Sequence, residues 1–390
     1  MHDNLCVVHR LNPPKSSLLW QHPTIEAPKS MSNDSFESVV ITVTLSHWKL
    51  AEVRRVFKNV FYHPDGKVPE EHLALADIWY TSWLGLPKDI KTISQIPRTR
   101  IVQLSSAGAN IFLGTELMQS EEAKKKIAVC SSSGIHTLSI PQYIICNVIN
   151  LYMKLQVQFH LSRTNAEWPS RDQVLQYAGV AGQTHPGNRC LYGKTVGMLG
   201  YGHIARETAR LFKAFNCNVI AANSKGDKRP EEGFRLPGTG DEDGSIPSQY
   251  YSTTDPESFK EFLSHCDVLV ASLPSTPQTT YMLTEFHLRS LPEGAVFVNI
   301  GRGDLIRSED ILAALDAEGG LFGAVLDVTD PEPLPSGHPL FTHPSVIVTP
   351  HTSGSFEGYF DSGADVLLAQ GDRLKQGLSP INVVDPAKGY

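Results

Sequence analysis

The sequence lacks three features that mark particular classes of protein. Its 390 residues contain no apolar run of about 18 residues or more, which a membrane-spanning helix requires. Its six cysteines are scattered without a CxxC pair, so we expect reduced thiols rather than a disulfide framework. Its formal net charge of -7 offers no basic field for nucleic acid. These absences favour a soluble, cytoplasmic protein that binds neither nucleic acid nor membranes.

What the sequence does contain is a regular alternation of strands and helices. Residues 1–38 lack it, and their proline, serine and histidine content predicts a tail or a partner-wrapping arm. From Val39 onward, β-branched strands alternate with helical segments, which indicates parallel sheets with ligand loops at the carboxyl ends of the strands. The chain is also longer than a single core usually allows. We therefore predict a substrate or catalytic domain of residues 39–138 plus 351–390, and a dinucleotide-binding domain of residues 139–350.

Local signals add detail to this organisation. The longest expected helix runs from Ser139 to Thr164 with Pro141 in its first turn, and its broad apolar face suits either the core or a second subunit. Residues 166–193 carry few regular signals. From Lys194, six short apolar strands are separated by helices, as in a doubly wound sheet. Residues 226–250 interrupt them, and their glycine, proline and charge content predicts a largely exposed insertion.

A glycine-rich loop is the first sign of a ligand. In "VGMLGYGHIARETA", Gly200, Gly202 and Ala205 form a G-x-G-x-x-G/A pattern between a strand and an amphipathic helix. Gly200 permits a tight turn, Gly202 lets the backbone approach a pyrophosphate, and Ala205 lets the helix pack closely. In this context the pattern predicts a dinucleotide site rather than a purely structural turn.

The end of the next strand bears on the choice of coenzyme. About 20 residues beyond the glycine loop, NAD sites place an acid that holds the ribose hydroxyls. This chain has Asn223 there, followed by Ser224 and Lys225, with Lys228 and Arg229 nearby. The missing acid and the three cations favour NADP(H), but NAD(H) stays open because the same cations could form a solvated loop.

Four motifs together resemble a known family. "GMLGYGHIA", "VNIGRGDLI", "LDVTDPEPLP" and "VTPHTSG" follow the order and spacing of the D-isomer-specific 2-hydroxyacid dehydrogenases, which include glyoxylate and hydroxypyruvate reductases. The resemblance extends from about Val39 to Val384. It implies an α/β fold of two doubly wound parallel-sheet domains, a Rossmann coenzyme domain and a smaller flavodoxin-like substrate domain, with a cleft between them. It also implies a homodimer and a reversible NAD(P)(H)-linked interconversion of a small 2-oxo acid and a D-2-hydroxy acid, glyoxylate and hydroxypyruvate types being favoured.

Carried over residue by residue, the resemblance assigns three catalytic roles. Arg302 of "GRGD" clamps the substrate carboxylate, His351 is the acid and base, and Glu332 of "DPEP" supports the histidine. The chemistry agrees, because the planar fork of arginine suits a carboxylate and imidazole exchanges protons near neutral pH. A paired carboxylate orients the imidazole and favours its charged form. In isolation Arg302 could cap a helix and Glu332 could mark a turn.

The same resemblance places the ligand contacts. The loop "SSAGAN" supplies the substrate-binding residues Ser106, Ala107 and Gly108, whose small side chains allow close approach. Asp327 helps to hold the nicotinamide carboxamide. The full set of expected coenzyme contacts is Gly200, Tyr201, Gly202, His203, Ile204, Asn223, Ser224, Lys225, Ser272, Leu273, Pro274, Thr276, Ile300, Gly301, Asp327 and Ser353.

Other polar residues receive no definite role. Asp330, His338 and His343 match no role in the family, and the prolines around them argue against a metal site, so we expect no metal. His136 could face the ligand or could cap or pack. Where the family more often has the pair Ala-Glu, this chain has a proline followed by Gln142. The coenzyme contacts near this pair therefore stay open.

A regulatory protein is the competing interpretation. The corepressors related to this family bind NAD(H) on the same fold and keep the catalytic residues, so an NAD(H)-binding regulatory protein stays an alternative. A formate-type dehydrogenase would have glutamine in place of Glu332 and is disfavoured. Turnover of 2-oxo acids would distinguish an enzyme from a regulator.

Overall fold

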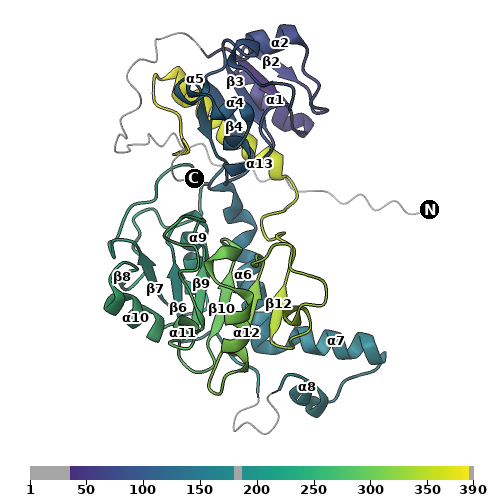
Figure 1. Ribbon diagram of the computed structural model, residues 1–390, viewed down its shortest axis with the longest axis vertical. Helices are drawn as coiled ribbons and strands as arrows, with labels where there is room; N and C mark the ends of the chain where they lie inside the picture. Colours follow the sequence, from purple (N-terminus) through teal and green to yellow (C-terminus); the bar gives the residue numbers. More distant parts are fainter. Residues whose placement is uncertain (1–35, 180–186, 386–390) are drawn as a thin grey trace, which may run out of the picture. The chain divides into compact units, whose positions relative to one another are not determined.

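The computed structural model describes residues 36–179 and 187–385. All but the last three residues of the predicted tail, which spans residues 1–38, lie outside the described residues. The described chain contains two parallel sheets, each flanked by helices (Figure 1). This confirms the prediction of an α/β fold with two parallel-sheet domains. No helix in the described ranges is both long and apolar enough to cross a membrane.

The first sheet has five parallel strands in the order β2-β1-β3-β4-β5, which is the flavodoxin-like order. Its strands are β1 (Ser38–Ile41), β2 (Asn59–Tyr62), β3 (Ile78–Thr81), β4 (Ile101–Leu104) and β5 (Ala128–Cys130). Its helices are α1 (His47–Val56), α2 (Glu70–Leu75), η1 (Ile93–Gln95), α3 (Asn110–Leu113), α4 (Glu116–Gln119), α5 (Glu121–Lys126) and, from much later in the chain, α13 (Tyr359–Lys375). A 3-10 turn, η2 (Ile135–Leu138), follows β5.

Two late segments of the chain complete this first domain. Ala364 and Leu367 of α13, yellow in Figure 1, join the core around Val39. The buried ammonium of Lys49 in α1 forms an ion pair with Asp365 at 2.5 Å, which holds α13 against α1. Farther on, residues 383–384 run along β5, where Val383 makes an antiparallel bridge to Cys130 and the N–H of Val384 donates to the carbonyl of Val129 at 2.8 Å. The far end of the chain is therefore part of the first domain's architecture.

The second sheet has seven parallel strands in the order β12-β11-β10-β9-β6-β7-β8. Its strands are β6 (Thr195–Leu199), β7 (Asn218–Asn223), β8 (Tyr250–Ser252), β9 (Val268–Ala271), β10 (Val296–Asn299), β11 (Gly323–Leu326) and β12 (Val346–Val348). Its helices are α6 (Ile140–Met153), α7 (Leu155–Asn165), α8 (Arg171–Tyr177), α9 (His203–Lys213), α10 (Pro256–Ser264), α11 (Glu285–Leu288) and α12 (Ser308–Asp316), with 3-10 turns η3 (Gly303–Leu305) and η4 (Pro339–Phe341). From β8 to β10 this is the Rossmann strand order, which reverses between β6 and β9.

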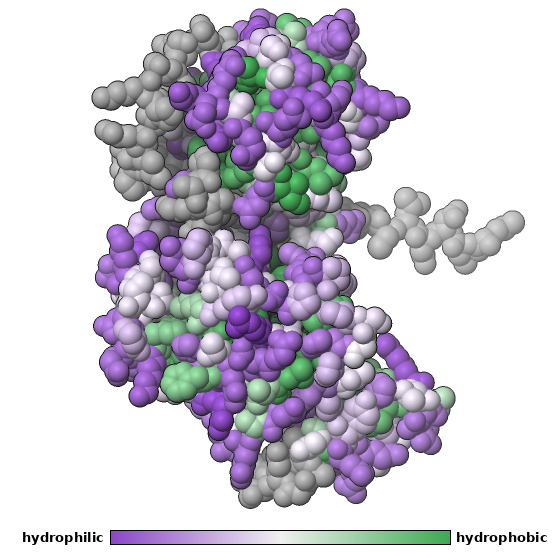
Figure 2. Space-filling model, in the orientation of Figure 1, coloured by the Kyte–Doolittle hydropathy of each residue, from purple (hydrophilic) through white to green (hydrophobic). Residues whose placement is uncertain are grey.

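Both faces of the second sheet are covered. Along β10, Phe297 enters one hydrophobic core, whereas Val296 and Val298 enter the core shared with α6 and α9. Burial on both faces explains why the strands read as nearly continuous apolar runs in the sequence. Hydrophilic side chains predominate on the molecular face shown in Figure 2.

Three local predictions were wrong. The single helix expected from Ser139 to Thr164 is two helices, because Lys154 adopts a left-handed backbone with φ of +54° and donates through Nζ to the carbonyl of Gly187 at 2.9 Å. Residues 166–193, where the sequence showed few regular signals, contain α8, which begins at a capping box of Ser170 and Gln173. The second sheet has a seventh strand, β8, which is too short to show any periodicity.

The insertion after β7 is anchored to α9 rather than largely exposed. The guanidinium of Arg206 donates to the carbonyls of Tyr201 at 3.1 Å, Asp241 at 2.5 Å and Arg229 at 2.8 Å. The hydroxyl of Tyr201 donates to the carboxylate of Asp241 at 2.7 Å. Glu231 and Asp241 are consequently buried. Composition could not reveal this, because the burial of these charges depends on bonds between the insertion and residues 201–206.

Candidate active site

The glycine-rich loop joins β6 to α9. Gly200 has a φ of +87°, a backbone conformation that favours glycine, and a Cβ built on it would lie 2.9 Å from Leu273 Cδ2, which would have to shift. A Cβ on Gly202 would meet no described atom within 4 Å, which leaves room for a ligand near the backbone. No side chain in the described ranges caps the first turn of α9, so its amide groups can face an anion. The loop therefore fits a dinucleotide pyrophosphate.

Three side chains of the loop turn into the protein. Tyr201 binds Asp241 of the insertion through its hydroxyl, and Ile204 packs against the core beneath α9. The Nδ1 atom of His203 lies 3.2 Å from Oγ of Ser133, and only 15% of its side chain is exposed. Any contact that these residues make with a coenzyme would therefore come mainly from their backbone.

The end of β7 forms a turn that presents cations. The amide of Asn223 donates to the carbonyl of Asp227 at 2.8 Å, and its Oδ1 accepts from the N–H groups of Lys225 at 3.0 Å and Gly226 at 2.9 Å. Ser224 and Lys225 are exposed, as are the two cations that follow, Lys228 and Arg229. Asn223 thus shapes the turn, and the turn carries positive charge.

The other expected coenzyme contacts lie at neighbouring strand ends. Because β6, β9 and β10 are adjacent, their carboxyl ends bring together the glycine loop, Ser272–Pro274 and Ile300–Gly301. A Cβ on Gly301 would lie 2.5 Å from the carbonyl oxygen of Leu273, so this approach is close. Thr276 closes a turn through a contact of 3.0 Å between its hydroxyl and that of Thr279.

Arg302 follows β10 and is fixed by short local bonds. Its Nη1 donates to the carbonyl of Gly301 at 2.7 Å, and its own carbonyl accepts from the amide of Asn299 at 3.0 Å. A Cβ built on Gly108 would lie 3.0 Å from Nη2 of Arg302. The guanidinium and the predicted substrate loop therefore lie side by side, although they come from different sheets.

The substrate loop follows β4. The Oγ of Ser106 donates to the carbonyl of Gly108 at 2.7 Å, and the carbonyl of Ser106 accepts from the N–H of Ser132 at 2.8 Å. These bonds bend the loop around Ala107. Residues 107 and 108 carry no side chain larger than a methyl group. A small ligand could approach the backbone there, next to the guanidinium of Arg302.

His351 and Glu332 form a hydrogen-bonded pair. His351 lies just after β12 in a left-handed conformation, with φ of +54°, and its N–H donates to the carbonyl of Asp327 at 2.9 Å. Its Nδ1 lies 2.8 Å from Oε1 of Glu332. The two side chains are 51% and 41% exposed. The carboxylate orients the ring from one side and leaves Nε2 on the other side for proton transfer.

Asp327 organises the loop that carries His351. Its carboxylate is buried and accepts from the hydroxyl of Thr349 at 2.6 Å, the N–H of Thr352 at 2.9 Å, and both the N–H and the hydroxyl of Ser353. Asp327 and Ser353 were predicted as coenzyme contacts, and the structure places them in contact with each other. Their bonds fix the backbone around His351.

The other polar residues of this stretch support turns. Asp330 accepts from the hydroxyl of Tyr281 at 2.6 Å. His338 and His343 accept from backbone N–H groups two residues later, at 3.3 and 3.1 Å. Among the described residues, no group of three or more His, Cys, Asp or Glu side chains is placed to hold a metal.

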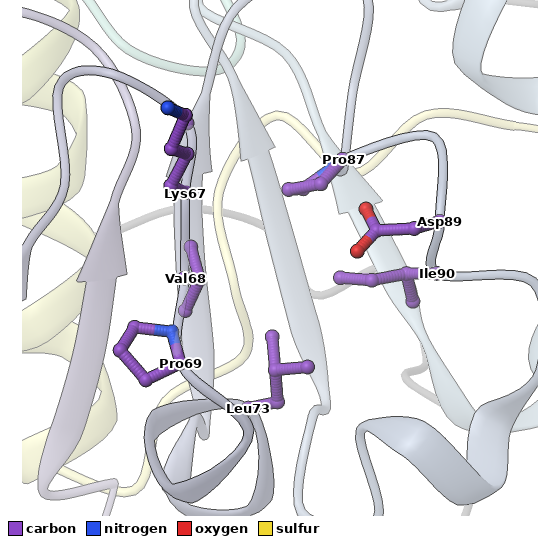
Figure 3. Close-up of a pocket in the computed structure, with 8 residues that line it drawn as sticks. Lys67, Val68, Pro69, Leu73, Pro87, Asp89 and Ile90 are labelled. Carbon is purple, nitrogen blue, oxygen red and sulfur yellow. The ribbon is translucent and has the colours of Figure 1, made fainter.

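A surface pocket lies apart from these residues. It has a volume of about 420 Å³ and is lined by the segments after β2 and β3, including Lys67, Val68, Leu73 and Asp89 (Figure 3). None of its lining residues belongs to the predicted site. The candidate site is therefore defined by convergent polar groups rather than by this pocket.

The two sheets and the glycine loop define a dinucleotide-binding α/β protein. Residues 157–353, half of the chain, match the NAD-binding domain of the D-isomer specific 2-hydroxyacid dehydrogenases. The chain belongs to this family, as the four sequence motifs predicted. An uncharacterized protein from the proB 3' region of Corynebacterium melassecola is 35% identical over 197 residues. The match covers 50% of this chain and 59% of that relative, so the chain spans about three fifths of its length.

Solved structures share the fold over most of the chain. A D-isomer specific 2-hydroxyacid dehydrogenase family protein of Aeromonas salmonicida is 23% identical with a TM-score of 0.65, over 90% of this chain and 100% of the other. The NADPH-dependent glyoxylate/hydroxypyruvate reductase of Sinorhizobium meliloti, solved with NADP and sulfate, is 21% identical, with a TM-score of 0.65 over 91% and 100%. A D-isomer specific 2-hydroxyacid dehydrogenase of Xanthobacter autotrophicus, solved with NADPH, is 20% identical with the same TM-score and coverage. At these identities the likeness shows the fold alone.

Proposed function

We propose that this protein is an NAD(P)(H)-dependent oxidoreductase that interconverts a 2-oxo acid and a D-2-hydroxy acid. The observation that carries the proposal is the contact of 2.8 Å between His351 Nδ1 and Glu332, in a chain whose Arg302 lies against the loop at Gly108. Together these groups supply an acid, its partner and a carboxylate clamp. Glyoxylate and hydroxypyruvate are the favoured substrates, on the resemblance of the motifs.

Each residue has a definite task in the reduction. Arg302 binds the substrate carboxylate with its planar guanidinium, and the backbone of residues 106–108 holds the same group from the other side. The coenzyme, when bound, supplies a hydride to the carbonyl carbon. His351 donates the proton on Nε2 to the carbonyl oxygen, so that the alkoxide never forms free. Glu332 holds Nδ1 and keeps the ring aligned, and solvent can return the proton because His351 is half exposed.

We propose that the coenzyme is NADP(H), and NAD(H) is the alternative. The turn after β7 carries Lys225, Lys228 and Arg229 and lacks the acid that would repel a 2'-phosphate. The same proposal includes a homodimer, a cytoplasmic location, and the domain boundaries at 138/139 and 350/351.

The direct test is a steady-state screen of the full chain. Each assay offers one 2-oxo acid with NADPH or with NADH, and the acids are glyoxylate, hydroxypyruvate, pyruvate and phenylpyruvate. Oxidation of the coenzyme is followed as the loss of its absorbance at about 340 nm. Turnover of one or more of these acids supports the proposal. A chain that binds coenzyme but turns over none of them would instead be a regulatory NAD(H)-binding protein.

Asn223→Asp tests the coenzyme preference. A carboxylate at the end of β7 should repel the 2'-phosphate and accept from ribose hydroxyls, so kcat/KM for NADPH should fall about tenfold relative to that for NADH. Asn223→Gln, which adds no charge, is the matched control. Equal losses with both coenzymes would contradict the proposed role of this turn.

A further inference from the structure

The imidazole of His136 lies near the candidate site and has no role in the reaction proposed above. It lies in the 3-10 turn η2, which begins where the N–H of Ile135 donates to the carbonyl of Ser132 at 3.3 Å. The N–H of Ser132 in turn donates to the carbonyl of Ser106 at 2.8 Å. The turn that carries His136 is therefore tied directly to the substrate loop.

The ring of His136 is fixed from the side of the catalytic histidine loop. A Cβ built on Gly354 would lie 3.2 Å from Cδ2 of His136, so the loop after His351 passes close to the ring. The hydroxyl of Tyr359, at the start of α13, lies 3.4 Å from Nε2 of His136. The two aromatic rings meet edge to face with centroids 5.6 Å apart. The turn that carries His136 is thus bonded to the substrate loop, and the ring itself lies against Tyr359 and the loop after His351.

The opposite nitrogen of His136 is left unsatisfied. Its Nδ1 is out of contact with solvent and has no hydrogen-bond partner within the described ranges. Burial, followed by the charges of Arg302 and His203, lowers the pKa of His136 to about 4, so the ring is neutral near neutral pH and carries one N–H. If the hydroxyl of Tyr359 donates to Nε2, this proton resides on Nδ1. A buried donor without an acceptor is unfavourable, unless a ligand supplies the acceptor.

We propose that His136 is a substrate-binding residue, whose Nδ1–H donates to the substrate carboxylate beside Arg302 and the loop at residues 106–108. Tyr359 is a positioning residue that keeps the proton on Nδ1 by donating to Nε2. The inference rests on the proposed function for the identity of the anion as a 2-oxo acid. An anionic oxygen is the group that satisfies both a guanidinium and an orphaned N–H, whereas a cation or an apolar group satisfies neither.

The test replaces the two ring nitrogens of His136 one at a time. In His136→Asn the side-chain amide nitrogen can occupy the place of Nδ1, and in His136→Gln it can occupy the place of Nε2. We expect His136→Gln to raise KM for the 2-oxo acid by about tenfold or more, as expected for loss of a hydrogen bond to a charged group. His136→Asn should stay within about threefold of the wild type, and KM for NADPH should not move in either variant. Equal effects of the two substitutions, or a loss confined to kcat or to coenzyme binding, would overturn the inference.

A second variant guards against a simple folding defect. Tyr359→Phe leaves the ring of His136 in place but removes the hydroxyl that orients its proton, so KM should rise about threefold, less than in His136→Gln. His265→Gln, an exposed histidine after α10, is the matched control and should match the wild type. A rise in KM of the same size in His265→Gln would overturn the inference.

Calorimetry separates this inference from the proposed function. Oxamate, a carboxylate isostere of a 2-oxo acid, is titrated into the full chain loaded with NADPH. The Kd of the wild type should rise about tenfold in His136→Gln and little in His136→Asn, whether or not any 2-oxo acid is turned over. Absence of turnover would thus overturn the proposed function alone. Oxamate binding that is undetectable in the wild type, or equal in all three proteins, would overturn the role of His136.

Discussion

His351 and His203 show how differently one residue type can be used within one chain. His351 is half exposed and pairs with a carboxylate, so it can exchange protons with solvent and be held in one orientation. His203 is buried under the insertion, where burial and the charge of Arg206 lower its pKa to about 4. Its Nε2 has no hydrogen-bond partner in the described ranges and lies 3.9 Å from the carboxylate of Glu231. Environment rather than residue type decides which histidine can act as an acid.

Replacing the exposed histidine, His351, should have the largest effect on activity. His351→Gln removes the proton donor and should lower kcat for 2-oxo acid reduction by about 100-fold to 10,000-fold. The Kd for NADPH, measured by fluorescence titration, should stay within about twofold. A decrease in kcat of less than about tenfold would assign the proton transfer to another group.

Arg302→Ala should have the next largest effect. Loss of the guanidinium removes the substrate clamp and should lower kcat/KM by about 100-fold or more. It also removes one of the charges that lower the pKa of His136. Arg289→Ala, at the exposed residue that follows α11, is the matched control and should retain wild-type kinetics. A change below about tenfold in Arg302→Ala would contradict the clamp.

Glu332→Gln tests what the carboxylate adds to His351. A neutral amide can still orient the ring but attracts a charged imidazole less, so proton donation by His351 should slow. We expect kcat for 2-oxo acid reduction at neutral pH to fall by about tenfold, as measured by steady-state kinetics. Glu309→Gln on α12 serves as the control, and a kcat in Glu332→Gln within about twofold of the wild type would count against the pair.

The buried histidine should affect stability rather than turnover, with the smallest effect. Between its ordinary pKa of 6.5 and its folded pKa of about 4, the unfolded chain binds a proton that folded His203 does not. The free energy of unfolding should therefore fall as the pH drops through this window, by about 2 kcal/mol at pH 5 for this one group. In His203→Gln that part of the decrease should disappear, as measured by urea unfolding at pH 7.5 and pH 5. The same acid sensitivity in wild type and variant would contradict this account.

Residues placed by short motifs could be predicted from the sequence. Gly200, Arg302 and His351 each lie within three residues of a strand's carboxyl end, and parallel strands bring these ends to one edge of a sheet. The family was recognised from four such motifs, and the match over residues 157–353 confirms it. The fold class was predicted for the same reason, because alternating strands and helices leave few topologies.

Residues brought together by distant segments could not be predicted. The contact of His136 with Tyr359 spans 223 positions, and no local pattern marks either residue. The resemblance assigned Asp327 to the coenzyme, and that role stays a prediction. Its bonds to Thr349 and Ser353 could not be predicted, because they depend on how β11 and β12 pair. The buried charges of the insertion were hidden for a similar reason, since burial of Asp241 depends on Arg206 and Tyr201 in a helix and loop before it.

The pairing of residues 383–384 with β5 has a consequence for aggregation. An edge strand with free N–H and C=O groups is a template on which a second chain can add, and proteins commonly cover such edges. Here Val383 and Val384 occupy part of the outer edge of β5 through the bridge to Cys130 and the bond to Val129. A chain shortened before Val383 would expose an apolar strand edge, so it should self-associate at concentrations where the longer chain stays dispersed.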